Sequence, residues 1–358
     1  MNKQEKIALS VIDVEQKYTV DPAETISASI VSWGANNDLP YLLSNCYDKS
    51  ATLKAAIDQS INYVCGDDVV VNEKAGLWQK QINRRGETMK DLIDHISYDY
   101  FVYGNFAIQV VFNALGLPVE LFPLDVSRCR LNEDGTKVLY SNKKWTKFQK
   151  SATEYDRFGE QINPENATQI YFWNAGGIRR RYNRPMWYAA LDDALTEVES
   201  SHYCLNNVVN GFGARYIINL PQTSNLTDEQ KEAISDGIKS KFCGPDADSN
   251  FMLYWMNGES DGLDVKKIDR TEDPEYLQAV RNGARENIFI SLRLSPLLCG
   301  LGSEKTGFAT AEYRDSYKLY DRSVAEPIRH IFEATLSKIT GIEDVVNIVP
   351  FSIKFEEV

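Results

Sequence analysis

Apolar positions recur most regularly between residues 273 and 338, at intervals of three and four residues. This spacing predicts two helices joined by a glycine-rich reversal. The first helix begins at Pro274, after the capping residue Asp273. It ends near Leu294, because Pro296 disfavours helical geometry in the residue before it. Its apolar face consists of Leu277, Val280, Ala284, Ile288 and Leu292.

The second helix follows the reversal and is longer. Thr310 is its predicted cap, and Glu312 suits the positive end of the helix dipole. Pro327 interrupts the pattern and predicts a kink. The apolar stripe consists of Tyr313, Tyr317, Tyr320, Val324, Ile328, Ile331 and Leu336.

The first half of the chain changes from helical to strand periodicity at Gly104. Helices are predicted over residues 50–64, ended by Gly66, and over residues 88–103. Alternating apolar residues then predict a hairpin over residues 106–124. Further short strands are predicted at 69–71, 129–131, 137–140 and 170–173.

Three segments of the first half lack a regular pattern. Residues 32–43 mix aromatic and turn residues, and residues 143–166 are polar, so both are predicted as loops. Residues 1–21 alternate weakly, which predicts an edge strand or an arm.

The second half contains a small alternating unit between two long helices. The first long helix opens at Arg184-Pro185 and closes at Gly211. A final strand is predicted over residues 345–355, and the fold class is α+β. The small unit comprises a strand at 216–220, a helix at 227–242 and strands at 251–256 and 263–268.

Composition and charge restrict the function. With 358 residues and 43% hydrophobic content the chain can bury a sizeable core and form two or three domains. Its 39 basic and 51 acidic residues give a net charge of −12. This charge argues against tight, sequence-specific binding of nucleic acid, but it suits a protein past which nucleic acid moves without sticking.

The cysteines predict neither a zinc site nor disulfides, since they are dispersed and have no histidine at ligand spacing. No apolar run reaches the length of a membrane span, and the N-terminus lacks the apolar core of a signal peptide. We therefore expect a cytoplasmic protein without a cofactor. The six cysteines are Cys46, Cys65, Cys129, Cys204, Cys243 and Cys299.

A glycine spacing like that of a phosphate-binding P-loop occurs in the reversal, between Gly302 and Gly307. That motif needs Lys and then Ser or Thr after the second glycine, whereas Phe308 and Ala309 follow here. A flexible loop is the preferred interpretation, and a soluble nucleotide-dependent enzyme is the alternative. The residues of this loop are Gly300, Leu301, Gly302, Ser303, Glu304, Lys305, Thr306 and Gly307.

Other candidate sites are weaker. His95, His202 and His330 lie on different predicted helices without a ligand or nucleophile motif, which is typical of packed or surface histidines. The acidic pairs at 67–68 and 192–193 have no third ligand, so neither metal nor acid–base chemistry is predicted. The densest basic patch, Arg179, Arg180 and Arg181, fits either contact with phosphates or a neighbouring subunit, or a solvated loop.

Short patterns in a fixed order extend from about residue 100 to residue 340. They lie at 103–108, 116–121, 123–124, 184–190, 210–214, 294–300 with Phe308 and Glu312, and 325–328. In this order they resemble the wing hairpin, stem helices, tunnel loop and following long helix of the portal proteins of tailed bacteriophages. Each pattern is degenerate, and their shared order carries the resemblance.

The resemblance implies a non-enzymatic ring, expected to be dodecameric, at the capsid vertex of the virion, assembled in the host cytoplasm. It implies a channel for packaging and ejecting double-stranded DNA without sequence specificity. The implied partners are copies of the chain itself, the terminase large subunit, the major capsid and scaffold proteins and a head-completion adaptor, with no membrane.

The implied parts follow the predicted elements, and a crown is small or absent because little chain follows Gly341. They are a mixed α/β wing (1–184), a first stem helix (185–214), an α/β clip (215–271), a second stem helix (272–296), a glycine-rich tunnel loop (297–309) and a long kinked helix with a C-terminal strand (310–358). An acidic lining suits a channel through which DNA slides, since every Lys or Arg contact would hold the polymer. Lys305 is the one basic residue of the proposed loop.

Overall fold

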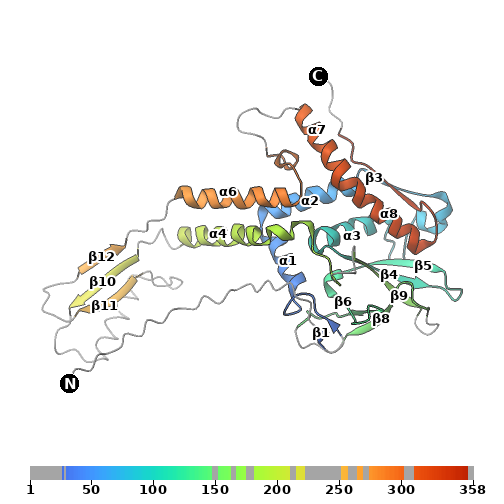
Figure 1. Cartoon of the computed structure of the whole chain (residues 1–358), viewed down its shortest axis with the longest axis horizontal. Helices are drawn as coiled ribbons and strands as arrows, with labels where there is room; N and C mark the ends of the chain where they lie inside the picture. Colours follow the sequence, from blue (N-terminus) through green and yellow to red (C-terminus); the bar gives the residue numbers. More distant parts are fainter. Residues whose placement is uncertain are drawn as a thin grey trace. The chain divides into compact units, whose positions relative to one another are not determined.

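The computed structural model describes residues 26–27, 30–146, 152–162, 167–174, 181–209, 215–221, 251–256, 264–268, 274–301 and 310–353. The chain divides into two compact units (Figure 1). The first is formed by residues 1–191 with 288–358, and the second by residues 192–287. Within the described ranges, no helix combines the length and the apolar character that a membrane crossing requires.

Helices of the first unit begin at capping residues. They include α1 (Leu39–Lys49), α2 (Ala51–Cys65) and α3 (Met89–Tyr103). The Ser50 hydroxyl accepts a hydrogen bond of 3.1 Å from the amide of Leu53 at the start of α2. Thr88 and Asp91 form a reciprocal capping box at the start of α3. The predictions of α2 and α3 are confirmed.

Helix α1 corrects the prediction of a loop over residues 32–43. The turn in this segment is short and ends at Asn37, whose amide donates to the Gly34 carbonyl at 3.1 Å. Pro40 lies in the first turn of α1, where its missing N–H has no partner to lose. The proline therefore starts this helix instead of breaking it.

The first unit contains, in its described part, a six-stranded sheet with the order β5-β4-β9-β8-β7-β6. Neighbouring strands are antiparallel except β8 and β9. This sheet confirms the predicted hairpin and the three short strands after it. The strands are β4 (Phe106–Phe112), β5 (Pro118–Leu124), β6 (Cys129–Leu131), β7 (Lys137–Tyr140), β8 (Thr153–Arg157) and β9 (Thr168–Trp173).

Strand β8 lies within residues 143–166, so the prediction of a loop there is wrong in part. Its sequence Thr-Glu-Tyr-Asp-Arg has no apolar alternation, and none of its side chains is buried. Its conformation follows from pairing with β7 on one side and β9 on the other. Pairing with the neighbouring strands therefore determines the extended conformation of β8, and its own sequence pattern does not.

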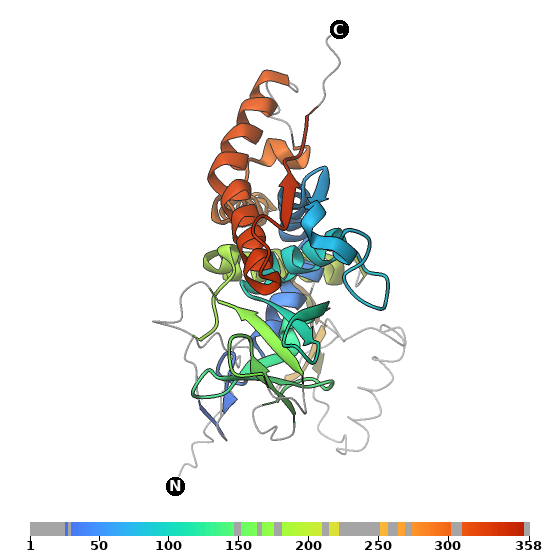
Figure 2. The same cartoon turned by 90° about the vertical axis from the view of Figure 1, so that its right-hand side faces the viewer.

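The C-terminal part of the first unit is a long interrupted helix. α7 (Thr310–Tyr320) is followed by a π-helical turn, η5 (Asp321–Ala325), and by α8 (Glu326–Thr340), and both views show them succeeding one another (Figures 1 and 2). The π turn lies directly before Pro327, which has no N–H to continue the α-helical ladder. The helix is thus interrupted at residues 321–325, before Pro327, which lies in the first turn of α8; a kink at the proline itself stays a prediction.

The final strand is shorter than predicted. β13 (Val346–Val349) pairs antiparallel with β3 (Asp68–Val71), which confirms the strand predicted at 69–71. Beyond Val349, Pro350 cannot donate to a ladder, and the Phe351 carbonyl accepts a hydrogen bond of 2.7 Å from Tyr317. The prediction that the strand continues beyond Val349 is therefore wrong for residues 350–353, the part of that segment that the structure describes.

An aromatic cluster joins α3, α8 and the sheet. Phe106 of β4 stacks on Trp173 of β9 with ring centroids 5.2 Å apart. Phe332 of α8 lies edge-on to Phe106 at 5.5 Å and to Tyr100 of α3 at 5.9 Å. Both helices thus cover one face of the sheet, with offset and edge-on contacts that aromatic rings favour.

The second unit contains two long helices and a small sheet. α4 (Leu191–Val209) and α6 (Pro274–Ser291) run side by side (Figure 1), and the Asn287 amide donates to Asp193 at 3.0 Å. α4 follows the short 3-10 helix η3 (Met186–Ala190). Both predicted long helices are confirmed, although α6 ends three residues before Leu294.

The small sheet of the second unit has the order β11-β10-β12. β10 is parallel to β11 and antiparallel to β12. All three predicted strands are confirmed, and the helix predicted at 227–242 lies outside the described residues. The strands are β10 (Arg215–Pro221), β11 (Phe251–Met256) and β12 (Asp264–Ile268).

Candidate functional site at the base of the glycine-rich reversal

The near side of the glycine-rich reversal is a packed 3-10 turn. η4 (Pro296–Cys299) contacts α2, and its residues Leu297 and Leu298 are buried. Gly300 ends the turn in the left-handed region, with φ of 78°, which suits glycine. The segment predicted as an open loop from residue 297 therefore begins with apolar side chains anchored in the first unit.

Tyr63 of α2 contacts both sides of the reversal. Its hydroxyl shares a hydrogen bond of 2.9 Å with the hydroxyl of Tyr313 on α7 and donates to the Leu298 carbonyl at 3.4 Å. Burial, and then the bond to Tyr313, raise the pKa of Tyr63 far above its ordinary value. Tyr63 therefore stays a neutral phenol that can donate a proton to a hydrogen bond.

Aromatic rings surround Tyr63. The centroid of its ring lies 5.0 Å from that of Tyr317, 5.8 Å from Tyr320 and 5.4 Å from Phe351. Tyr317 and Tyr320 lie on α7, and Phe351 follows β13. The cluster fastens the second half of α7 and the segment after β13 to α2, with each ring in a tilted or edge-on geometry.

The π turn carries a buried ion pair beneath this cluster. The Arg329 guanidinium donates to Asp321 at 2.7 Å and to the carbonyl of Tyr63 at 3.0 Å. Arg329 is buried and needs its acceptors, whereas the Asp321 side chain is 23% exposed and partly hydrated. A π turn widens the helix locally and is often found at functional sites. Here it places Asp321 within reach of Arg329.

We name these residues the reversal anchor: Tyr63, Leu298, Tyr313, Tyr317, Asp321, Arg329 and Phe351. The anchor can position both flanks of residues 302–309, but the pKa values of Tyr63 and Tyr317 are raised and its one carboxylate is paired. Among the described residues, no three His, Cys, Asp or Glu are grouped to hold a metal ion. Its chemistry therefore suits holding and orienting a segment.

The predicted loop residues are described only at their first positions. Gly300 and Leu301 follow η4, and the Leu301 side chain is 39% exposed. Gly302, Ser303, Glu304, Lys305, Thr306 and Gly307 lie outside the described residues, as does the predicted cap Asp273.

The basic patch is described only at Arg181, because Arg179 and Arg180 lie outside the described residues. The Arg181 guanidinium donates to the Glu133 carbonyl at 2.7 Å. At least one donor of Arg181 is thus used within its own chain. Contact with phosphate or with another subunit stays a prediction for this patch.

The three histidines occupy different environments. His95 on α3 lies 3.7 Å from the buried carboxylate of Asp99, and burial lowers the pKa of His95. His202 is exposed on α4. His330 is exposed on α8 beside Glu333, at 3.4 Å.

Both acidic pairs have structural partners. Asp67 accepts hydrogen bonds from the amide and hydroxyl of Ser352, which fixes the chain end after β13. Asp193 accepts from Asn287, as described above. These contacts assign the carboxylates to packing between segments.

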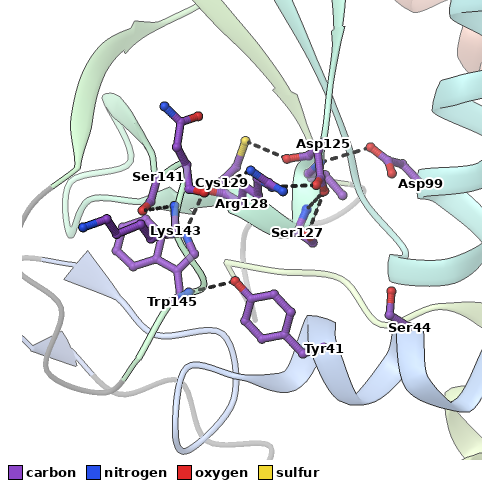
Figure 3. A network of polar contacts seen from close by, with 12 residues as sticks. Tyr41, Ser44, Asp99, Asp125, Ser127, Arg128, Cys129, Ser141, Lys143 and Trp145 are labelled. Atoms are coloured by element: carbon purple, nitrogen blue, oxygen red, sulfur yellow. Dashed lines mark hydrogen bonds and ion pairs between the residues drawn. The ribbon is translucent and has the colours of Figure 1, made fainter.

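A second polar network ties α1 to the sheet (Figure 3). The Trp145 amide donates to the Tyr41 hydroxyl at 2.8 Å, and its indole N–H donates to the Arg128 carbonyl at 2.7 Å. Asp125 accepts from the amide of Ser127 and from the Arg128 guanidinium, both at 3.0 Å. These polar groups thus form hydrogen bonds with one another inside the first unit.

Arg130 on β6 is buried beside that network. Its guanidinium lies 5.5 Å from the Trp33 ring and 5.2 Å from the Trp145 ring. It donates to the carbonyls of Ser127 at 2.8 Å and Asn37 at 2.9 Å. The residue fastens the segment before α1 to the sheet, and cation–π contacts replace part of its lost hydration.

Sequence reasoning missed the reversal anchor. Its partners are far apart in the chain, and no spacing rule joins Tyr63 to Tyr313. One signal was present: Arg329 interrupts an apolar helical face between Ala325 and Phe332. A charged residue in such a stripe requires a buried partner.

No family model and no curated protein matches this sequence. Solved structures do match. A chain from the neck of the empty gene transfer agent (GTA) particle, computed with C6 symmetry, has a TM-score of 0.57 at 15% identity over 87% of this chain and 84% of that chain. A chain from the neck of the native GTA particle, computed with C12 symmetry, has 0.54 at 14% identity over 86% and 83%.

An HK97 family phage portal protein from Corynebacterium diphtheriae matches with a TM-score of 0.51 at 12% identity, over 82% of this chain and 88% of that chain. The chain has the portal fold. The expected α+β class and the resemblance drawn from the short sequence patterns agree with these structures. At such low sequence identity the likeness to these structures shows the fold alone.

Proposed function

We propose that this chain is a portal protein, which forms a ring at the capsid vertex of a phage-like particle. The observation that carries the proposal is the portal fold over more than four fifths of the chain, found with necks of GTA particles and with a phage portal protein. The C6 and C12 symmetries of those necks support a ring of identical copies for this chain, with twelve as the expected number.

The parts of a portal correspond to the elements described above. α4 and α6 serve as the stem, β10, β11 and β12 belong to the clip, and the sheet of the first unit belongs to the wing. The separation of residues 192–287 as a compact unit supports a stem and clip that follow a wing. The domain boundaries given by the sequence are retained as part of the proposal.

In this proposal residues 297–309 form the tunnel loop of the channel, and the reversal anchor holds the described residues on both sides of 302–309. Double-stranded DNA passes through during packaging and ejection. The net charge of −12 disfavours lasting phosphate contacts along the channel. Lys305 is the loop residue assigned to DNA contact.

The proposed partners are other copies of the chain, the terminase large subunit, the major capsid and scaffold proteins, a head-completion adaptor and DNA. The chain itself is proposed to be non-enzymatic, so ATP hydrolysis belongs to the terminase. Its place is the portal vertex of the particle, after assembly in the host cytoplasm.

The test is the assembly state of the purified full-length chain. We expect annular particles in negative-stain microscopy and a ring mass near twelve protomers by native mass spectrometry. A monomer that binds nucleotide would overturn the proposal in favour of the nucleotide-dependent enzyme. A ring that supports no DNA packaging in a reconstituted capsid assay would restrict the role to a structural adaptor.

A further inference from the structure

The turn between β4 and β5 and the start of β5 expose three apolar side chains. Leu115, Leu117 and Val119 are 83%, 58% and 42% exposed. The Asn113 side chain accepts hydrogen bonds from the amides of Leu115 at 2.9 Å and Leu117 at 3.0 Å, and Gly116 supplies the positive φ. Side-chain and backbone bonds thus hold the turn, which does not need its leucines for its shape. Adjacent exposed apolar residues are typical of a binding surface.

Residues 78–85 run alongside β5 and bring basic side chains to this turn. The Leu121 amide donates to the Ile82 carbonyl at 3.0 Å, and the Trp78 indole N–H donates to the Val119 carbonyl at 3.4 Å. Lys80, Arg84 and Arg85 are exposed on this segment. The segment therefore places positive charge next to the apolar turn.

Side chains of β5 contact the two arginines, Arg84 and Arg85. The guanidinium carbons of Arg84 and Arg85 lie 5.6 Å and 5.1 Å from the Phe122 ring, and Arg84 also lies 3.4 Å from the Glu120 carboxylate. Arg84 nevertheless stays 74% exposed. We call the set of Leu115, Leu117, Val119, Lys80, Arg84 and Arg85 the tip surface.

We infer that the tip surface docks against an acidic, partly apolar surface of a neighbouring copy of this chain. This inference rests on the proposed ring. In a ring closed by rotation, each copy meets its neighbour through two different surfaces, so one surface must complement another on the same chain. Apolar side chains next to arginine are the composition typical of an interface core.

Charge complementarity favours a second copy as the occupant. Residues 73–90 carry five basic and two acidic residues, whereas the whole chain has a net charge of −12. The remainder of every copy is therefore more acidic than the average, and it is present at the same concentration as the tip. DNA would satisfy the arginines but would leave Leu115 and Leu117 in water.

The experiment compares ring formation by full-length variants across protein concentration, using mass photometry. For Leu115→Ser with Leu117→Ser we expect about a tenfold higher concentration for half-assembly, corresponding to the loss of part of an interface. The double variant Arg84→Glu with Arg85→Glu should raise the concentration for half-assembly in the same way. Its ring formation should also depend less on salt concentration. Leu319→Ser, which removes a leucine 72% exposed on α7, is the matched control. Unchanged thermal unfolding verifies that each variant folds.

The outcomes separate this inference from the proposed function. If the unmodified chain forms no ring, the proposed function fails and the inference with it. If rings form and both tip variants assemble at the same concentrations as the unmodified chain, the inference alone fails. An equal loss in Leu319→Ser would also overturn it, because any exposed leucine would then matter. Normal rings with weakened DNA binding would assign the tip surface to DNA instead.

Discussion

The hydroxyl of Tyr63 lies 2.9 Å from the hydroxyl of Tyr313 and joins α2 to α7 across 250 positions of the chain. The same Tyr63 hydroxyl donates to the Leu298 carbonyl at 3.4 Å, on the opposite side of the reversal. One phenol thus restrains both flanks of residues 302–309. This arrangement separates the loop from its supports, so that the loop can be changed without dismantling the first unit.

Tyr63→Phe should lower the free energy of unfolding by about 1 kcal/mol, because it removes the hydroxyl but keeps the ring among its aromatic neighbours. Urea denaturation of the full chain measures the loss. Tyr276→Phe is the control, since this tyrosine is 67% exposed and its change should stay within about 0.5 kcal/mol. Equal stability of the Tyr63 variant and the unmodified chain would show that water replaces the two bonds.

Arg329→Met should destabilise the first unit by about 1.5 to 3 kcal/mol, because it removes a charge-assisted hydrogen bond to Asp321. The Arg329 side chain is 5% exposed in this pair. Arg322→Met changes a neighbouring arginine of the π turn that is 82% exposed, and its effect should be within about 1 kcal/mol. Chemical denaturation compares the two variants. Similar losses in both would contradict a special role for the buried pair.

Local chemistry made most elements of the fold predictable. Ser50, Thr88 and Gly104 mark helix ends by side-chain caps or by the left-handed region, which act over a few residues. Strand β8 and helix α1 were missed for opposite reasons. β8 has no pattern of its own and depends on both neighbours, whereas Pro40 suggested a break where it starts a helix.

The sequence predicted where the candidate site lies, but not the contacts that form it. Glycines and Pro296 located the reversal, but the contacts that fix it join segments more than two hundred residues apart. Such long-range pairs have no periodic signature in one sequence. Arg329 in an apolar stripe indicated that a buried partner exists, yet Asp321 becomes that partner only through the π turn.

Gly104→Ala should cost clearly more than the roughly 1 to 2 kcal/mol of a left-handed alanine. An added Cβ would lie 2.6 Å from backbone atoms of Arg184 and Pro185, which lead into α4. Gly341→Ala is the matched control, since Gly341 also ends a helix in the left-handed region, with φ of 69°, but has no atom within 4 Å of the added carbon. Thermal unfolding of both variants measures the difference. Equal costs would mean that the segment at Arg184 moves away easily.

Asp99 should make stability fall as pH rises. Burial and the nearby Asp125 carboxylate raise its pKa well above the ordinary value, near 4, that it has in the unfolded chain. Between these two pKa values the folded state holds the extra proton. Each pH unit therefore removes up to about 1.4 kcal/mol of stability.

Asp99→Asn should remove this dependence, because the asparagine side chain is neutral at every pH. It can still accept the hydrogen bond that the Val126 backbone N–H donates to Asp99 at 3.2 Å. The stability of the variant relative to the unmodified chain should rise between pH 5 and pH 8, measured by urea denaturation. Asp48→Asn, which changes an exposed aspartate of α1 in the same way, is the matched control. A variant destabilised by the same amount at every pH would contradict a raised pKa of Asp99 and would leave only the loss of a hydrogen bond.

Shortening the reversal within residues 300–307 should leave ring assembly intact and impair DNA packaging or retention. The reason is that Leu298 and Tyr313 hold the flanks through Tyr63, so the subunit core does not depend on the loop. Rings are counted by negative-stain microscopy, and packaged DNA is measured as nuclease-protected DNA in capsids. Lys305→Ala should change DNA retention less than the shortened loop, since it removes one phosphate contact only.

A shortened chain that forms no rings would identify the loop as a structural joint between η4 and α7. To separate that outcome from simple misfolding, thermal unfolding of the shortened chain is compared with that of Tyr63→Phe. If the loop is a channel element, its shortening should cost less stability than loss of the anchor hydroxyl, because the bonds of Tyr63 to Leu298 and Tyr313 remain. If it is a joint, the order of the two losses reverses, and the channel role of Lys305 falls with it.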